Sequence, residues 1–150
     1  MIAIRAMTAE DIDAVMKLEA RTPEAPHWEH VAYQRLFSPG TEKVQCAAWV
    51  AMGDGEIEGF AVARLVVDVC ELESIAVAER ARRKGTGTVL LNRVSAWAAA
   101  KGAAKLELEV RAGNDSAIRF YERAGLVCEG LRRGYYREPD EDAVLMGKGL

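Results

Sequence analysis

One basic, glycine-bearing stretch, Arg82-Arg83-Lys84-Gly85-Thr86-Gly87-Thr88, is well suited to binding an anion. It lies between an apolar run that ends at Val77 and an amphipathic segment that begins near Gly85. A strand that ends in such a turn and opens into a helix presents backbone N–H groups and the positive end of the helix dipole to one ligand. The stretch therefore predicts a pyrophosphate site.

The spacing of the glycines separates this turn from other phosphate motifs. The donors are expected to be the N–H groups of residues 83–88, with glycine at 85 and 87 because a Cβ there would block close approach. Arg82 and Lys84 add positive charge. The turn is not a P-loop, since Lys84 precedes the glycines, and not a dinucleotide fingerprint, since Leu90 stands where the third glycine belongs.

The elements before the turn follow from apolar periodicity. Residues 2–7 predict a short strand, and Thr8 offers an N-cap for a helix that Pro23 and Pro26 end. Residues 27–37 predict a second short helix, whose inward side chains are expected to be Trp28, Val31, Leu36 and Phe37. An antiparallel hairpin is predicted at residues 44–52 and 57–67, and a further strand at residues 71–77.

The elements after the turn complete an alternating plan. A helix is expected up to Lys101-Gly102, then a strand at residues 105–111, in which Glu109 faces away from Leu108. Asn114 is the predicted N-cap of a helix that Gly125 ends, and two strands follow, at residues 126–136 and 143–146. The order β-α-α-β-β-β-α-β-α-β-β predicts an α/β fold, a three-layer domain over residues 1–150 with a mixed, mostly antiparallel sheet.

Composition excludes several other classes of protein. The chain has 150 residues, of which 50% are hydrophobic, and a net charge of -3, which argues against a nucleic-acid binder. The cysteines, Cys46, Cys70 and Cys128, are expected to be buried and reduced. Two histidines without cysteines or spaced carboxylates predict no metal site. The short apolar runs predict a soluble cytoplasmic protein without membrane contact.

From the turn onward the sequence resembles the GNAT (Gcn5-related N-acetyltransferase) superfamily, in both its acyl-CoA pyrophosphate motif and its element order. The downstream segments resemble the RimI branch, whose members acetylate the N-terminal amine of a small-subunit ribosomal protein. They are Leu108-Glu109-Val110-Arg111-Ala112-Gly113-Asn114, Ala117-Ile118, Phe120-Tyr121-Glu122, Gly125-Leu126, Arg132-Arg133-Gly134-Tyr135-Tyr136 and Glu141-Asp142-Ala143. Arg82 and Lys84 replace the family's more frequent Gln and Arg, which an anion site tolerates.

The resemblance implies acetyl-CoA as co-substrate and a role for particular residues. Ile75, Ala76 and Val77 would pair with the pantetheine arm, and Asn114 and Ala117 would lie against the cofactor. Glu109 would be the general base, with Glu71 and Glu73 as competitors, and Tyr121 the acid that protonates the departing thiolate. The expected acceptor site comprises Glu73, Arg132, Arg133, Tyr135, Tyr136, Glu138, Asp140, Glu141 and Asp142.

Three functions stay open at this point. A protein N-terminal α-amine is favoured as acceptor, because its pKa near ~8 demands less of a base than a lysine does. A small amine, such as an amino acid, polyamine or antibiotic, is the alternative within the enzyme class. A non-catalytic acyl-CoA sensor is the alternative outside it. The chain is expected to be a monomer or weak dimer.

Overall fold

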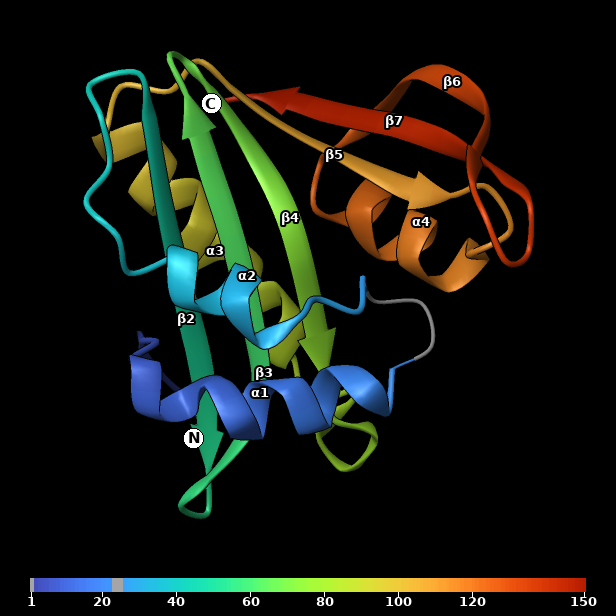
Figure 1. Ribbon diagram of the computed structural model, residues 1–150. Coiled ribbons are helices and arrows are strands. Elements are labelled where there is room, and N and C mark those ends of the chain that lie inside the picture. Colours follow the sequence, from blue (N-terminus) through green and yellow to red (C-terminus); the bar gives the residue numbers. More distant parts are fainter. Residues whose placement is uncertain (1, 23–25) are drawn as a thin grey trace.

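The computed structural model describes residues 2–22 and 26–150. Its helices and strands follow one another in the predicted order (Figure 1). They are β1 (Ala3–Ala6), α1 (Ile12–Ala20), α2 (His30–Arg35), β2 (Val44–Gly53), β3 (Glu56–Val66), β4 (Val69–Val77), α3 (Thr86–Ala100), β5 (Lys105–Arg111), α4 (Asp115–Arg123), β6 (Val127–Tyr136) and β7 (Glu141–Gly149). Short 3₁₀ turns at Ala9–Asp11 and Glu79–Ala81 precede α1 and α3.

The strands form one seven-stranded sheet in the order β1-β2-β3-β4-β5-β7-β6. Every neighbouring pair is antiparallel except β4 and β5, which are parallel. That parallel pairing covers only Val69–Glu71 and Lys105–Glu107, after which the two strands separate (Figure 1). The predicted mixed, mostly antiparallel sheet is confirmed, and it is split at its centre.

Helices cover both faces of the sheet, and each face has its own apolar core. On the face that we call the α1/α2 face, Ile12, Val15 and Leu18 pack on Val50, Phe60 and Val62. On the α3/α4 face, side chains of α3 and Tyr121 of α4 pack on the alternate positions of the same strands. The two-residue period of a strand divides the side chains between these cores.

A β-bulge at Glu73 reverses this alternation within β4. Val62 of β3 pairs with Ser74 whereas Ala63 pairs with Leu72, so Glu73 is the extra residue. Leu72 therefore packs in the α3/α4 core, and Ala76, four residues later, packs in the α1/α2 core. A bulge adds one residue to one strand and changes which face the following side chains point to.

Two expectations about burial are wrong. Val31 and Phe37 are exposed, with Tyr33 of α2 fully buried instead, because α2 is shorter than predicted and only one of its faces meets the sheet. Cys46 and Cys128 are exposed, while Cys70 is buried; all three are free thiols, as expected. Cys128 lies on β6, the edge strand of the sheet, most of whose residues face solvent.

The remaining differences concern the ends of elements. The last strand begins at Glu141 and ends at Gly149, so the connection between the two last strands is residues 137–140, two residues shorter than the predicted 137–142. Pro23, one of the two prolines expected to end the first helix, lies outside the described residues. Over the described ranges, none of the helices is both long enough and apolar enough to cross a bilayer.

Candidate active site

The separation of β4 from β5 leaves a gap in the centre of the sheet. Beyond Glu71 the edge of β4 that faces β5 has no strand partner among the described residues, although its other edge stays paired with β3 as far as Val77. Unpaired backbone N–H and C=O groups of a strand edge can bind an extended ligand. Ile75, Ala76 and Val77, which the resemblance assigns to the pantetheine arm, lie on this edge.

The turn that follows β4 contains two residues with a positive φ angle. Arg83 has φ = 66° and Gly85 has φ = 84°, both in the left-handed region, and Gly85 is the N-cap residue of α3. Open space surrounds the position that a Cβ on Gly85 would occupy, so its positive φ accounts for glycine there. Consecutive N–H groups around left-handed residues form a concave anion-binding nest.

The absence of a side chain at Gly87 leaves room for close packing between α3 and α4. A Cβ at Gly87 would lie 3.3 Å from the Phe120 ring of α4. Thr86 is buried, and its hydroxyl donates to the carbonyl of Ala81 at 3.5 Å. Thr88 is exposed in the first turn of α3. The glycine therefore brings the first turn of α3 against α4.

The cations of the turn differ in their contacts. Arg82 donates through Nε to the carbonyl of Val77 at 3.3 Å, which ties the turn to the last residue of β4. Arg83 and Lys84 are exposed, and neither takes part in an ion pair with another described residue. Their charge is available to a ligand at this end of the gap.

The helix α4 brings Asn114, Ala117 and Tyr121 to the same face as the turn. The Asn114 side chain accepts a hydrogen bond from the Ala117 N–H at 3.3 Å, which confirms the predicted N-cap. Tyr121 is buried, 8% exposed, in the α3/α4 core. Burial, followed by the neighbouring Tyr136, raises the pKa of the Tyr121 phenol, so the group keeps its proton at neutral pH.

Glu109 lies on the opposite face of β5. Leu108 and Val110 point into the α3/α4 core, so the side chain of Glu109 points to the α1/α2 side. Its Oε1 is 3.6 Å from Nη2 of Arg132, whereas its Oε2 is buried and has no hydrogen-bond partner among the described residues. A buried carboxylate oxygen without a donor is costly, and it is available to a donor brought by a ligand.

Two further groups lie near Glu109 on the α1/α2 side. Burial, together with the charge of Glu71 and less strongly of Glu109, raises the pKa of Glu73, while Arg64 lowers it. The Glu109 carboxylate beside the Tyr135 phenol, followed by burial, raises the pKa of Tyr135. Glu71 is 3.8 Å from Arg64 and so is already paired. The structure thus brings Glu73, Glu109 and Tyr135 together.

Tyr136 and the acidic residues after it have structural contacts. Burial, then the charge of Glu109, raises the pKa of Tyr136 to about 12, and the Arg111 guanidinium lies 4.4 Å from the centre of its ring. Glu141 accepts from the Gly113 N–H and lies 3.3 Å from Arg111. Asp142 accepts from the Gly134 N–H at 2.8 Å. These two carboxylates hold the β6–β7 connection.

The other residues of the predicted acceptor site are less engaged. Asp140 lies 3.8 Å from Arg137, and both side chains are exposed. Arg132 lies 5.5 Å from the centre of the Tyr135 ring, and Arg133 and Glu138 are exposed. Of the four carboxylates predicted for the acceptor site in residues 138–142, therefore, only Glu138 and Asp140 are exposed, in the turn between β6 and β7.

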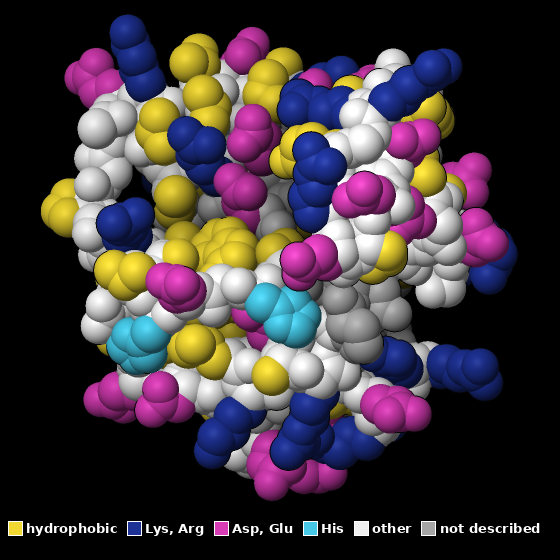
Figure 2. Space-filling model, turned by 45° about the vertical axis from the view of Figure 1, so that its right-hand side comes forward, with side chains coloured by type: hydrophobic (Ala, Val, Ile, Leu, Met, Phe, Trp, Pro, Cys, Tyr) yellow, Lys and Arg dark blue, Asp and Glu magenta, His cyan; other side chains and the backbone are white. Residues whose placement is uncertain are grey.

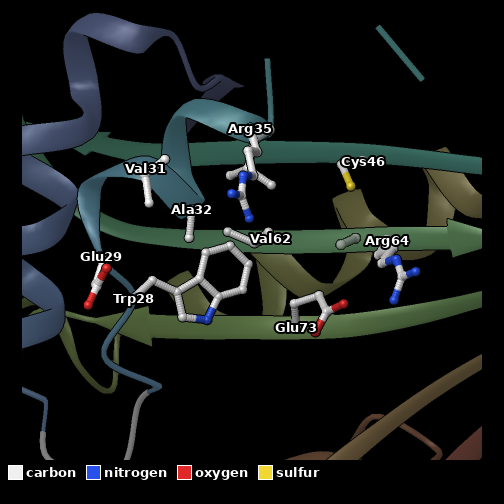
Figure 3. Close-up of a pocket in the computed structure, with 11 residues that line it drawn as sticks. Trp28, Glu29, Val31, Ala32, Arg35, Cys46, Val62, Arg64 and Glu73 are labelled. Carbon is white, nitrogen blue, oxygen red and sulfur yellow. The ribbon is translucent and has the colours of Figure 1, made fainter. Parts of the chain in front are cut away.

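A pocket that sequence reasoning missed opens beside Glu73. Its volume is about 460 Å³, and Trp28 and α2 form one side of it while β2, β3 and β4 form the other (Figure 3). The Trp28 indole lies over Val62, between α2 and Glu73 (Figure 3). Figure 2 shows hydrophobic side chains gathered in the middle of this face, with charged side chains around them. The sequence contains one indication of the bulge at Glu73. Leu72 and Ile75 are three residues apart, which interrupts the two-residue alternation of apolar side chains in β4.

Comparison with known proteins identifies the architecture built around this gap. The acetyltransferase (GNAT) family profile matches residues 12–126. The chain belongs to this family. A GNAT member is an acyltransferase, so the resemblance in sequence and the predicted enzyme class are both confirmed.

Individual relatives extend the GNAT match over nearly the whole chain. A putative ribosomal protein bS18-alanine N-acetyltransferase of Bacillus subtilis is 31% identical over 96% of this chain and 93% of its own length. An N-alpha-acetyltransferase of Sulfurisphaera tokodaii is 30% identical over 98% of this chain and 92% of its own. The crystal structure of the Escherichia coli ribosomal-protein-S18-alanine N-acetyltransferase superposes with a TM-score of 0.83, at 29% identity, over 99% and 94% of the two chains.

Proposed function

We propose that this GNAT protein transfers the acetyl group of acetyl-CoA to the N-terminal α-amine of a protein, and that a ribosomal protein of the bS18 kind is its acceptor. The support from relatives is that both the bacterial and the archaeal proteins are named for α-amine acetylation. Ribosomal proteins are made in the cytoplasm, so the proposal also places the protein there. A monomer or weak dimer is sufficient, since one chain contributes every proposed group.

One observation carries the proposal: a carboxylate with a free buried oxygen and a protonated phenol lie on opposite faces of the sheet. The carboxylate is Glu109 and the phenol is Tyr121. Transfer of an acyl group from a thioester to an amine needs a base on the amine side and an acid on the sulfur side. Such an enzyme therefore needs two groups separated in this way.

The residues of the α3/α4 face fit acetyl-CoA. Residues 82–88 would hold its pyrophosphate through the N–H groups around Arg83 and Gly85, with the side chains of Arg82, Arg83 and Lys84 adding charge. The free edge of β4 at Ile75–Val77 would pair with the amide groups of the pantetheine arm. Asn114 and Ala117 would line the α4 side. When bound, acetyl-CoA supplies the acetyl thioester.

The residues of the α1/α2 face would receive the amine. Glu73 and Glu109 attract an ammonium group, and Tyr135 and Tyr136 border the same space from β6. Glu109 takes the proton of the amine, directly or through one water, and the neutral amine attacks in a ternary complex. The C–S bond of the thioester then breaks, and Tyr121 gives its proton to the leaving thiolate, which becomes the free thiol of CoA. Both Glu71 and Glu109 lie near an arginine, but Glu109 keeps a buried oxygen without a partner among the described residues, which makes Glu71 the weaker candidate for the base.

The test is thiol release from acetyl-CoA by the purified protein with peptides that begin with Ala or Ser. We expect release with a free N-terminus and none with the same peptide already acetylated, even when it contains an internal lysine. A parallel series of small amines checks the alternative acceptor class. Release with small amines alone, or no release with any amine, would contradict the proposal.

A further inference from the structure

Glu19, near the end of α1, is a buried carboxylate that the proposed chemistry does not use. It is 3% exposed, and it lies seven residues after Ile12 on the inner stripe of the helix, where the other side chains are apolar. Burying a carboxylate is expensive unless hydrogen bonds compensate for the lost water. An apolar side chain would fill this position of the helix at lower cost, so the presence of a carboxylate there needs an explanation.

Both oxygens of Glu19 are taken by groups from the segment after α1. Oε1 accepts from the backbone N–H of Trp28 at 2.6 Å, and Oε2 accepts from the hydroxyl of Tyr33. The Trp28 and Tyr33 rings also pack together, with centroids 5.3 Å apart. Charge-assisted hydrogen bonds of this kind are stronger than neutral ones. The Glu19 carboxylate thus holds the backbone of Trp28 and the hydroxyl of Tyr33, the residue whose ring packs on Trp28.

The surroundings of Glu19 shift its pKa in opposite directions. Burial raises the pKa of Glu19, while the bonds from Tyr33 and Trp28 lower it, and the lowering by His27 is the smallest effect. Burial, followed by the bond to Glu19, raises the pKa of Tyr33, so its hydroxyl remains a donor. Tyr33 therefore keeps its role as a donor to Glu19.

Trp28 connects Glu19 to the pocket beside the proposed amine site. Its indole forms a wall of that pocket, over Val62 and next to Glu73 (Figure 3). Glu73 in turn lies close enough to Glu109 for that charge to raise its pKa. A shift of Trp28 would therefore change the space next to the amine, whereas the turn at residues 82–88 would keep its shape.

We propose that Glu19 is a positioning residue for acceptor binding, which holds Trp28 as the wall of the pocket beside Glu73 through the Trp28 N–H and the Tyr33 hydroxyl. This inference rests on the proposed function, because it assigns the pocket to the acceptor. Glu19 touches neither reacting group. Its loss acts on the binding of the acceptor and leaves the binding of acetyl-CoA unchanged.

Two substitutions separate the hydrogen bonds of Glu19 from its charge. Glu19→Leu has a similar size and leaves the Trp28 N–H and the Tyr33 hydroxyl without a partner. We expect it to raise the KM for the acceptor peptide about tenfold, with kcat and the KM for acetyl-CoA within about twofold. Glu19→Gln keeps one oxygen to accept and gains an N–H to donate, so it should raise the peptide KM less than about threefold.

Asp11→Asn is the matched control. Asp11 is also a buried carboxylate, 8% exposed and bonded to Arg5 and the Thr8 N–H, but it does not line the pocket. Asp11→Asn should lower the Tm without changing either KM. A merely structural role of Glu19 would give the same result for Glu19→Leu, and that result would overturn the proposal.

Amide hydrogen exchange tests the contact independently of activity. In Glu19→Leu, the Trp28 N–H should exchange at least about tenfold faster than in the wild type, and in Glu19→Gln by less than about threefold. Unchanged Trp28 exchange in Glu19→Leu would also overturn the proposal. Failure of the proposed function would be seen elsewhere, since the wild type itself would release no thiol with any peptide.

Discussion

The two faces of the sheet at the central gap are built by different means. On the α3/α4 face the polar groups are mostly backbone: the N–H groups around Arg83 and Gly85 and the free edge of β4. On the α1/α2 face they are side chains, chiefly Glu73, Glu109 and Tyr135. A backbone site depends on conformation and tolerates side-chain changes, whereas a side-chain site depends on charge. Substitutions should therefore act on the two faces in distinct ways.

The largest effect is expected from Tyr121→Phe, because one proton is lost while the ring still fills the α3/α4 core. We expect kcat to fall about 10²- to 10³-fold, with the dissociation constant of acetyl-CoA within about twofold. Stopped-flow thiol release and calorimetric titration measure the two quantities. A fall in kcat of less than about threefold would remove Tyr121 from the chemistry and leave it as a core residue.

Glu109→Gln should be next, because it removes the proposed base from the α1/α2 face. An α-amine with a pKa near ~8 is partly neutral already, so we expect kcat/KM for the peptide to fall about 10- to 100-fold at neutral pH and to recover partly at high pH. Glu107→Gln is the matched control on the same face of β5, where the carboxylate pairs with Lys105. Equal losses in both variants would argue for a general charge effect.

Gly85→Ala tests the backbone site, because Gly85 has a positive φ and nothing near its absent Cβ. Strain of about 1 kcal/mol in the turn should weaken acetyl-CoA binding about three- to tenfold, with little change in the KM of the peptide. Gly102→Ala has the same strain, at φ = 87° beyond the other end of α3. Gly102→Ala should lower the Tm by a similar amount and leave the affinity for acetyl-CoA unchanged. An equal loss of affinity in Gly85→Ala and Gly102→Ala would show that the turn at residues 82–88 has no specific role in binding acetyl-CoA.

The smallest effect is expected from the pH dependence of acceptor binding. Burial and Glu71 raise the pKa of Glu73 above its ordinary value of 4.5, so Glu73 becomes neutral at a pH where ordinary glutamates are still charged. The peptide KM should rise about two- to fivefold as the pH falls towards that raised pKa. Glu73→Gln should flatten this profile and leave the acetyl-CoA profile unchanged. A wild-type profile in the variant would exclude Glu73 from acceptor binding.

The α3/α4 face was the part of the site that could be predicted from the sequence. On this face, the turn at residues 82–88 and the N-cap at Asn114 depend on neighbours in the chain, as does the alternation of β5 that turns Glu109 to the opposite face. Short-range rules of conformation are sufficient for such features. The element order and the mixed sheet followed from the same rules.

The α1/α2 face could not be predicted to the same extent, because it is assembled from distant segments. The inward orientation of Tyr33 depends on Glu19, fourteen residues earlier in the chain. The bulge at Glu73 depends on the register between β3 and β4. Glu141 and Asp142, which the acidic run suggested for a ligand, bind the N–H groups of Gly113 and Gly134 instead. Only the assembled sheet specifies these contacts.

The short pairing between β4 and β5 also has a mechanical consequence. Three residues on each strand join the half of the sheet that α3 covers to the half that carries α4. This seam is the shortest strand pairing in the sheet. A pantetheine arm paired to the free edge of β4, with Asn114 and Ala117 on its other side, would contact both halves of the sheet. The co-substrate would then stiffen the enzyme while it is bound, and the two halves would loosen again each time the product leaves.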